Sequence, residues 1–553
     1  MSFSDSNNVY GGTGNGIADM LIGGGIGGFS QNSTQNLDVN YPAREAYAQD
    51  TFKLTPRLTV MFGLRLQPYF GVREAQDHFV TFRPGQQSTV FPTAPVGLVT
   101  VSDQGIPSNL SGNRYNVGPR VSFAWDVLGN HKAALKGGYG RYTDYQVLLG
   151  FNGYTSTAPF GVSYAPLTQG LNLTQPYQQY GSVPFPYTPP ASGSKAALTY
   201  VYPNPLDTMA VSPDYNSGQY DKFNLTFEIE PINSYVFSVA WVATRATHLN
   251  ETHNLNWPRF VPGASTNDSS NILSREPYYL EGFNTISQFF SDYSSMYNAL
   301  QFTVNKRYSY GLTLLGNYTF SSAWGQQGCR YLADCGLDYY SPGTTHAMSA
   351  AVRYELPFFK NGSWLGRELL GGWAIGGTTV ASTGSYGSIS DYNCNEFNFN
   401  SAGCYASYAG GGALLSNRKQ RVYSAGSMIG VSWVDPSKFV RADQVATNGA
   451  PTTLPGLGQK LFFGNATYGV FKGPASGVLD FNASLNKDFP IKERYKLNFH
   501  VAAFNAFNHT VLEFNPSTAP LYNSTVGPNT IGFGAINTAA APRNVQLSAH
   551  FIF

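Results

Sequence analysis

Few side chains of this sequence are spaced as catalysis requires. A serine followed by a lysine three residues later occurs twice, at Ser192 with Lys195 and at Ser416 with Lys419. Both pairs lie in loop-like sequence instead of opening a helix, and so short a pattern recurs by chance. Zinc-protease HExxH, nucleophile-elbow GxSxG and phosphate-loop patterns are absent, and no carboxylate pair stands out as an acid and base. We therefore predict that the protein is not an enzyme and has no cofactor.

The four cysteines fall into two close pairs, Cys329 with Cys335 and Cys394 with Cys404. Their spacing does not resemble that of a zinc site. Close pairs are typical of small loop disulfides formed in an oxidising compartment. Sequence alone leaves the connectivity open, but the short spacings favour pairing within each pair.

The composition restricts the class of protein. The 553-residue chain has 12% charged and 15% aromatic residues, whereas soluble domains carry roughly 25% charge. Such a surface suits lipid, yet the mean hydropathy is −0.21 and no apolar run reaches the roughly 18 residues of a membrane helix. Membrane-spanning strands with one apolar face explain both the low charge and the low mean hydropathy, because hydropathy averaged along the sequence hides the alternation of apolar and polar residues. The net charge of +2 offers no basic patch for nucleic acid.

Strict alternation of apolar and polar residues recurs along the chain. The apolar positions are Leu58, Val60, Phe62, Leu64 and Leu66; Phe223, Leu225, Phe227 and Ile229; Leu479, Phe481, Ala483 and Leu485; and Leu497, Phe499 and Val501. Several alternating runs extend over about 10 residues, the span that a tilted strand needs to cross a bilayer. Soluble strands average about 5 to 6 residues. The pattern predicts membrane-spanning strands.

Short and long connections alternate between these strands. Short turns are expected at Lys53–Arg57, Leu128–His131, Glu230–Ser234, Asn305–Gly311 and Asn486–Arg494, with a longer turn near Leu356–Gly371. The intervening segments are long and rich in Gly, Pro, Ser, Asn and Tyr. Outer-membrane barrels are built in this way, with the short turns in the periplasm and the long loops outside. We therefore predict an all-β, antiparallel, up-and-down transmembrane barrel.

Counting the strands predicts an incomplete barrel. Six turns define twelve strands, and the run from Val545 to Phe553 adds a thirteenth. Bacterial single-chain barrels have even numbers of strands, and the segment from Met1 to Asp5 has no export signal. We therefore expect a truncated N-terminus with strands missing at the front, and a chain that cannot close a barrel by the usual pairing.

Several motifs resemble TonB-dependent receptors, most closely the Oar-like group, which is abundant in acidobacteria. The first runs from Tyr47 to Thr59 (YAQDTFKLTPRLT) and is followed by Gly63-Leu64-Arg65. The others are Gly118–Asn130, Gly137–Gly140, Ser295–Gln301 with Lys306-Arg307, Tyr354–Pro357, Gly371–Ile375, Phe504–His509 and Ala541–Phe553. Each motif alone is weak, but their order and spacing cover nearly the whole chain.

The resemblance implies a barrel of about 22 strands in the outer membrane of a Gram-negative bacterium, with the lumen plugged by an N-terminal domain. Residues 1–40 would form an extracellular loop region and residues 41–553 a partial barrel of about 13 strands. Such receptors often also carry a carboxypeptidase-regulatory-like domain. They capture a ligand at the extracellular loops and use TonB, through the plug, for uptake. The ligand is unknown, and without a plug this chain should not transport actively.

Two groups of residues are candidate sites. Phe551 and Phe553 end the last strand and resemble the signal for the barrel-assembly machinery; the alternative is an ordinary buried strand that ends in Phe. Loop aromatics could stack on a sugar or peptide ligand, or pack on one another. They are Tyr278, Tyr279, Phe289, Phe290, Tyr339 and Tyr340. Aromatics expected near strand ends, as girdles in contact with outer-membrane lipid, are Trp125, Tyr139, Trp241, Tyr318, Phe320 and Trp373.

Two other functions remain open. A passive outer-membrane protein, either a porin-like channel or an adhesin, would share the barrel but lack energy coupling. A secreted, carbohydrate-active all-β protein would have short soluble strands and a carboxylate pair in a cleft, and the sequence shows neither.

Overall fold

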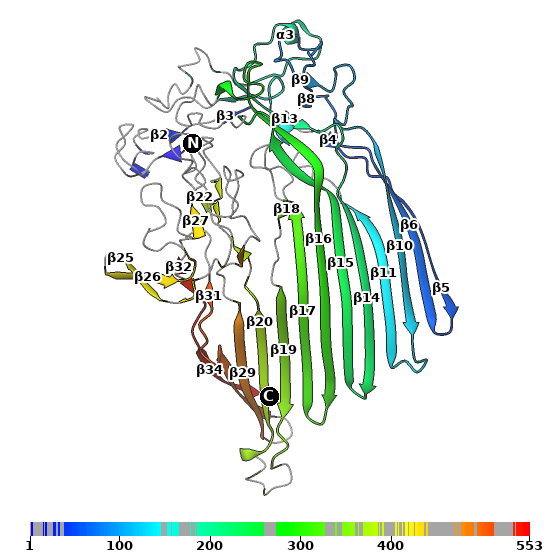
Figure 1. Ribbon diagram of the computed structural model, residues 1–553, viewed down its shortest axis with the longest axis vertical. Helices are drawn as coiled ribbons and strands as arrows, with labels where there is room; N and C mark the ends of the chain where they lie inside the picture. Colours follow the sequence, from blue (N-terminus) through cyan, green and yellow to red (C-terminus); the bar gives the residue numbers. More distant parts are fainter. Residues whose placement is uncertain are drawn as a thin grey trace.

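A computed structural model of the protein is dominated by one large antiparallel sheet (Figure 1). The structure describes residues 38–144, 185–258, 273–326, 345–359, 371–384, 477–491, 495–513 and 538–553, with shorter stretches between them. Thirteen strands follow one another in an up-and-down order, in agreement with the predicted count. They are β5 (Ala46–Thr55), β6 (Leu58–Tyr69), β10 (Arg114–Asp126), β11 (Ala133–Thr143), β14 (Gln219–Ile232), β15 (Tyr235–Asn254), β16 (Phe283–Ser309), β17 (Leu312–Gln326), β19 (His346–Glu355), β20 (Trp373–Ser382), β29 (Leu479–Ile491), β30 (Tyr495–Phe504) and β34 (Asn544–Ile552).

The strand register divides the side chains between two faces. Leu225 of β14 is paired with Gly137 and Trp241, and the preceding residue, Asn224, with Gly138 and Val242. Since neighbours along a strand point to opposite sides, whole rows are apolar on one face and polar on the other. The apolar face is exposed along its length, at Leu64, Val121, Leu225, Val239, Phe302, Val352 and Ile375 among others.

The opposite face, called the polar face here, carries Arg120, Ser122, Lys136, Asn224, Thr226, Gln301, Thr303, Asn317, Asn482 and Asn486. A soluble protein would bury its apolar face and expose the polar one. This sheet leaves the apolar face uncovered, which is the arrangement of a wall between lipid and an aqueous lumen.

The sheet is an open, curved wall (Figure 1). Its edges are β5 and β34, each of which pairs with one neighbour in the described sheet. Every residue of β5 is exposed. The expectation that these strands do not close a barrel among themselves is therefore confirmed in this structure.

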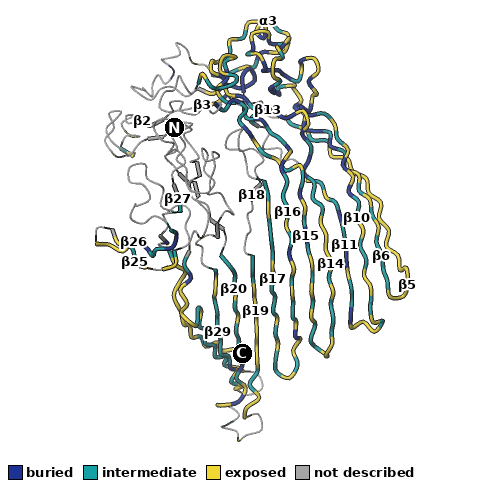
Figure 2. The backbone as a smooth tube through the Cα atoms, in the orientation of Figure 1, coloured by how far each residue is buried: buried dark blue, intermediate teal, exposed yellow. Residues whose placement is uncertain are grey.

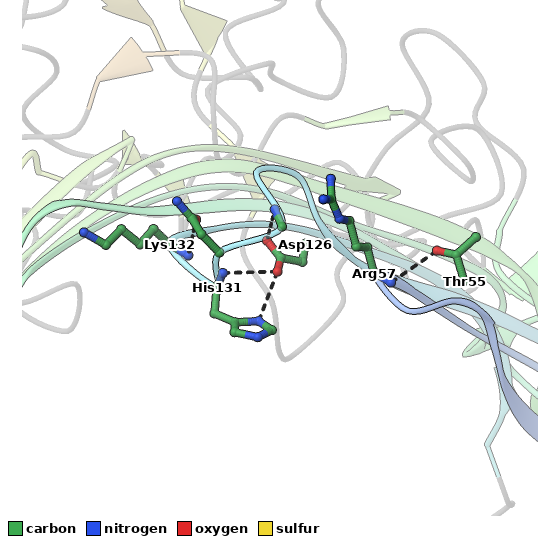
Figure 3. A network of polar contacts seen from close by, with 7 residues as sticks. Thr55, Arg57, Asp126, His131 and Lys132 are labelled. Carbon is green, nitrogen blue, oxygen red and sulfur yellow. Dashed lines mark hydrogen bonds and ion pairs between the residues drawn. The ribbon is translucent and has the colours of Figure 1, made fainter.

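The short turns lie together at one end of the sheet, called the turn end here. Figure 3 shows the turn between β10 and β11, where the Asp126 carboxylate accepts hydrogen bonds from the backbone of Gly129 (2.8 Å) and His131 (3.1 Å). Gly129 has a φ of +74°, and a Cβ there would lie 2.3 Å from Cζ of Arg57 in the adjacent turn. Glycine is therefore required where the two turns pack together.

Two buried lysines mark the turn end of the apolar face. Lys306 is 2% exposed, and its ammonium donates to the carbonyls of Ser309 (2.8 Å) and Leu312 (2.9 Å). Its Nζ also lies 5.1 Å from the centroid of the Tyr235 ring. Lys487 repeats the arrangement, donating to the Gly371 carbonyl beside the Trp373 ring. Amphipathic lysines of this kind direct their charge toward an interface.

The aromatic residues match the girdle prediction only in part. Trp125 and Trp373 lie at the turn end, as predicted. Trp241 instead shares a row with Leu225 in the middle of β14, so its prediction as a girdle residue was wrong. The alternation of apolar and polar residues fixes which face of the sheet a side chain occupies. Its position between the two ends of the sheet depends on the register between strands.

The opposite end of the sheet, called the loop end here, carries a packed cap that the sequence analysis treated only as loops. Strands β15 and β16 extend to 20 and 27 residues, and β13 (Leu206–Val211) pairs in parallel with β16. Figure 2 shows buried residues gathered there. Two clusters form the core, one around Phe82, Phe91 and Phe283 and the other around Tyr69, Tyr154 and Tyr215.

Smaller elements complete the cap and its surroundings. They are β4 (Val39–Asn40), β7 (Arg73–Glu74), β8 (Val80–Phe82), β9 (Leu98–Thr100), α2 (Asn152–Thr155), β12 (Ser163–Tyr164), α3 (Lys195–Leu198) and β18 (Asp338–Tyr339). Further short strands are β1 (Ser2–Phe3), β2 (Ile26–Gly28), β3 (Gln31–Asn32), β21 (Tyr386–Gly387), β22 (Ser390–Asp391), β23 (Cys404–Tyr405), β24 (Ser407–Tyr408), β25 (Arg421–Ser424), β26 (Ser427–Ser432), β27 (Phe439–Val440), β28 (Phe471–Lys472), β31 (Leu512–Glu513), β32 (Ala535–Ile536) and β33 (Thr538–Ala539). No helix in the described part of the chain is long and apolar enough to span a membrane.

Replacing Leu225 by Arg should destabilise the sheet, because it places a charge in the middle of the apolar face. We expect a loss of about 2–4 kcal/mol in the free energy of unfolding, as found for lipid-facing positions of membrane barrels. Urea titration of the protein folded in phospholipid vesicles measures the loss. The control is Asn224→Arg, one residue away on the polar face. Equal losses for the two variants would contradict the assignment of the faces.

Candidate ligand-binding groove on the polar face

A groove of about 690 Å³ crosses six neighbouring strands of the described sheet, β5, β6, β10, β11, β14 and β15. Most residues that line it belong to the polar face. They include Thr51, Met61, Arg120, Ser122, Lys136, Gly138, Gly140, Tyr142, Lys222, Asn224 and Thr244. The groove is therefore a depression in the wall on the side that faces the lumen of a barrel.

Two glycines of β11 create the depression. Gly140 is paired with Arg120 on one side and with Lys222 on the other. Gly138, one polar-face position along, is paired with Ser122 and Asn224. Because these glycines lack side chains, neighbouring side chains can lean over β11: Asn224 lies over Gly138, and Tyr142 lies over Gly140. A Cβ on Gly138 would lie 2.9 Å from Oδ1 of Asn224, so the space has no room for a larger residue there without rearrangement.

The ring of Tyr142 folds over Gly140 and holds two cations. The guanidinium carbon of Arg120 lies 4.7 Å from the ring centroid, and Nζ of Lys222 lies 5.3 Å from it. Both distances are within the range of cation–π attraction. A Cβ on Gly140 would come within 3.1 Å of the ring and hydroxyl of Tyr142. The glycine thus permits the ring position that brings the cations together.

The groove has an unbalanced positive charge. Lys136 is neutralised by Glu228, with 2.6 Å between Nζ and Oε2. Among the described residues, neither Arg120 nor Lys222 forms an ion pair, and none of the residues lining the groove is acidic. Nε of Arg120 is buried and has no hydrogen-bond acceptor. The arrangement is suited to binding an anion.

A second groove of about 470 Å³ lies across β17, β19, β20, β29 and β30. Its polar lining includes Arg353, Thr378, Asn482, Asn486 and His500. Nδ1 of His500 contacts the side-chain oxygen of Asn486. This groove is mostly neutral, so the first groove is the more distinctive candidate site.

The predicted loop aromatics are distributed over the cap. Tyr278 packs edge-on against Phe82 with 4.8 Å between ring centroids, while the neighbouring Tyr279 is exposed. Phe289 and Phe290 belong to the extension of β16 and lie beside Tyr154 (5.8 Å) and His253 (4.7 Å). These contacts are packing within the cap. Their role in ligand contact stays a prediction.

The remaining predicted sites are only partly described. Tyr339 lies in β18 and is paired with Gly325, whereas Tyr340 lies outside the described residues. Cys329, Cys335 and Cys394 also lie outside them, and Cys404 begins β23, so the disulfides stay predictions.

At the C-terminus, Phe551 lies on the apolar face of β34. Its ring stacks on Tyr495, with 5.8 Å between centroids, and lies 6.4 Å from Phe553. Both phenylalanines are exposed. The barrel-assembly role itself stays a prediction.

The prediction that Ser192 and Lys195 lie in a loop was wrong for Lys195. Lys195 opens the short helix α3, whose N-cap is Ser194, although this segment was expected to be a loop. The helix forms because the Ser194 hydroxyl accepts a hydrogen bond from the backbone of Ala197 (3.1 Å). Lys419 of the second pair lies outside the described residues. No cluster of potential metal ligands occurs in the part of the chain that is described.

The groove residues Arg120, Tyr142 and Lys222 were not predicted as a site. Gly137–Gly140 was noted only as a family motif. The available signal was a strand rich in glycine between strands with basic residues on their polar faces. Finding the site also required the register, which sequence alternation does not supply.

Hydrogen-bonded polar groups hold the cap together. The carboxylate of Asp103 accepts from the Ser88 hydroxyl (2.8 Å) and from the backbone of Thr89 (2.8 Å) and Thr100 (2.9 Å). Burial raises the pKa of Asp103, but these hydrogen bonds outweigh it, and the net pKa is lowered. The carboxylate is therefore a structural anchor.

A second buried group joins β15 to the start of β16. Asn256, which is 1% exposed, donates to the carbonyl of Phe283 (3.0 Å) and to the carboxyl of Glu276 (3.2 Å). Its side-chain oxygen accepts from the backbone of Tyr278 (2.7 Å). Burial raises the pKa of Glu276 to about 7.

An exposed apolar face, a polar opposite face and an up-and-down antiparallel order define the class of outer-membrane β-barrels. The family model of the outer membrane beta barrel domain matches residues 1–546. The chain belongs to this family, and the outer membrane is its location. The predicted fold class is thereby confirmed. No match was found among curated proteins.

Solved outer-membrane receptors and transporters show a distant likeness to the chain. The FrpB iron transporter from Neisseria meningitidis is 9% identical over 93% of this chain and 46% of its own, with a TM-score of 0.38. The ferric-catecholate import receptor Fiu from E. coli K12 is 12% identical over 92% and 44%, with a TM-score of 0.37. The siderophore receptor PiuA from Acinetobacter baumannii is 8% identical over 93% and 43%, with a TM-score of 0.37. The chain spans less than half the length of each.

The cap should loosen around Asn256 as the pH rises. Because the folded-state pKa of Glu276 is raised from 4.5 to about 7, its contribution to stability is present below pH 4.5 and is lost as the pH rises through about 7. We expect the hydrogen-exchange protection factor of the Tyr278 amide to fall between about pH 5 and about pH 8. Glu276→Gln should remove this pH dependence. An unchanged pH dependence in that variant would assign the effect to another group.

Proposed function

We propose that the chain forms part of the wall of an outer-membrane receptor or transporter that takes up a solute from outside the cell. The observation that carries this proposal is the two-faced sheet, which has an uncovered apolar face and a grooved polar face. A purely adhesive protein has no need of grooves on the side that faces the lumen. The resemblance of the sequence motifs to TonB-dependent receptors supports the same function.

The open edges of the sheet support a larger assembly. In lipid, unpaired backbone groups along β5 and β34 would cost several kcal/mol each. The wall is therefore completed by further strands that pair with these edges, giving a barrel of about 22 strands. A plug in its lumen would contact the TonB complex and couple uptake to energy from the inner membrane. The barrel-assembly machinery would recognise the strand that ends at Phe551 and Phe553.

The cap would provide the ligand entrance. Its two apolar clusters include residues from the loop ends of β6 and β16. A ligand would first meet exposed cap residues such as Tyr279 and then the polar face of the wall. Rigid packing beneath the entrance would keep this surface in place.

Ion conductance separates this function from a passive channel. We expect the full-length protein, isolated from the outer membranes of its host, to give little steady conductance in planar bilayers, because the proposed plug would occupy the lumen. A plug-free porin of similar size would conduct continuously. Sustained conductance of the full-length protein would favour the passive channel. Recovery of the protein in a fraction other than the outer membrane would contradict both.

A further inference from the structure

The pair formed by Arg120 and Lys222 has no structural role that requires two cations. Both belong to the polar face, on strands that flank Gly140. Two other basic residues of this face have acidic partners, in the pairs Lys136–Glu228 and Arg65–Glu45. Placing two like charges against one ring costs Coulomb energy that the cation–π contacts offset only in part.

We propose that Arg120 and Lys222 bind a small anion with a carboxylate or phosphate group on the wall of the lumen. This inference rests on the proposed function, because it makes anionic solutes the substrate class of the transporter. The Tyr142 ring covers Gly140, and the groove beside the ring leaves room for an anion to meet both side chains. A negative charge there removes the repulsion between the cations.

The chemistry of the two cations suits such a ligand. The planar guanidinium of Arg120 presents a fork of donors that matches carboxylate and phosphate oxygens. Its buried Nε, which has no acceptor in the protein, faces no competing carboxylate within the groove. The ammonium of Lys222 adds a mobile point charge. The ring of Tyr142 limits the positions of both cations, which reduces the entropy lost on binding.

Neutral groups beyond the cations define the rest of the site. Ser122 and Asn224 flank Gly138 on the next polar-face row. Their hydroxyl and amide groups can donate to uncharged parts of a solute. The groove of about 690 Å³ exceeds the needs of a simple ion, so an organic anion fits the space better than phosphate alone.

Equilibrium dialysis tests the inference with two probes, radiolabelled phosphate and radiolabelled citrate, and the full-length protein in detergent. We expect both probes to bind, citrate more tightly, and binding to weaken with added NaCl. Arg120→Gln and Lys222→Gln should each weaken citrate binding by about tenfold or more, the effect of losing a charge-assisted hydrogen bond.

The matched control is the double variant Arg65→Gln/Glu45→Gln, which removes an ion pair of the polar face whose residues do not line the groove and leaves the net charge unchanged. It should bind citrate as the unmodified protein does. The inference is overturned if neither probe binds, or if the single variants bind as tightly as the control. Resistance to protease confirms that each variant is folded.

The outcome can be separated from that of the proposed function. A full-length protein that lies in the outer membrane with a plugged lumen, but binds neither probe, would overturn the anion site alone. A protein that binds citrate through Arg120 and Lys222, yet conducts ions continuously, would overturn the coupled transporter and retain the site.

Discussion

The structure depends on one constraint: inside a bilayer, backbone N–H and C=O groups must be paired within the protein. An antiparallel sheet satisfies this constraint row by row, and the alternation of side chains then supplies two different surfaces. In this chain, Leu225 and Asn224 are neighbours in sequence but belong to an apolar and a polar surface. The same constraint bears on β5 and β34, each of which has one neighbour in the described sheet.

The ends of the sheet differ because they meet different surroundings. At the turn end, connections are short, and Lys306 and Lys487 direct their charges to turn carbonyls beside aromatic rings. At the loop end, β15 and β16 continue past the other strands into a cap with its own apolar core. The cap is held by buried polar anchors such as Asp103 and Asn256. The proposed uptake rests on this packed cap above a grooved wall.

Much of the fold could be predicted from the sequence, because it follows from local patterns. Alternation at Phe223, Leu225 and Phe227 identifies a strand and its apolar face, and the six short turns give the strand count. The site could not be predicted in this way. Arg120 and Lys222 are 102 positions apart in the chain, and they meet only because both are paired with Gly140. The core of the cap likewise depends on packing between segments far apart in the chain. The position of Trp241 between the two ends of the sheet depends on the register of β14 and β15.

The central claim is that one face of the sheet meets lipid and the other meets water. The most direct measurement is cysteine scanning from Phe223 to Ile229 in intact outer membranes, with a membrane-impermeant maleimide as the label. The account predicts labelling at Asn224, Thr226 and Glu228 and protection at Phe223, Leu225, Phe227 and Ile229, with the pattern alternating at every residue. Uniform labelling, or alternation in the opposite phase, would contradict the assignment of the faces and the membrane wall built on it.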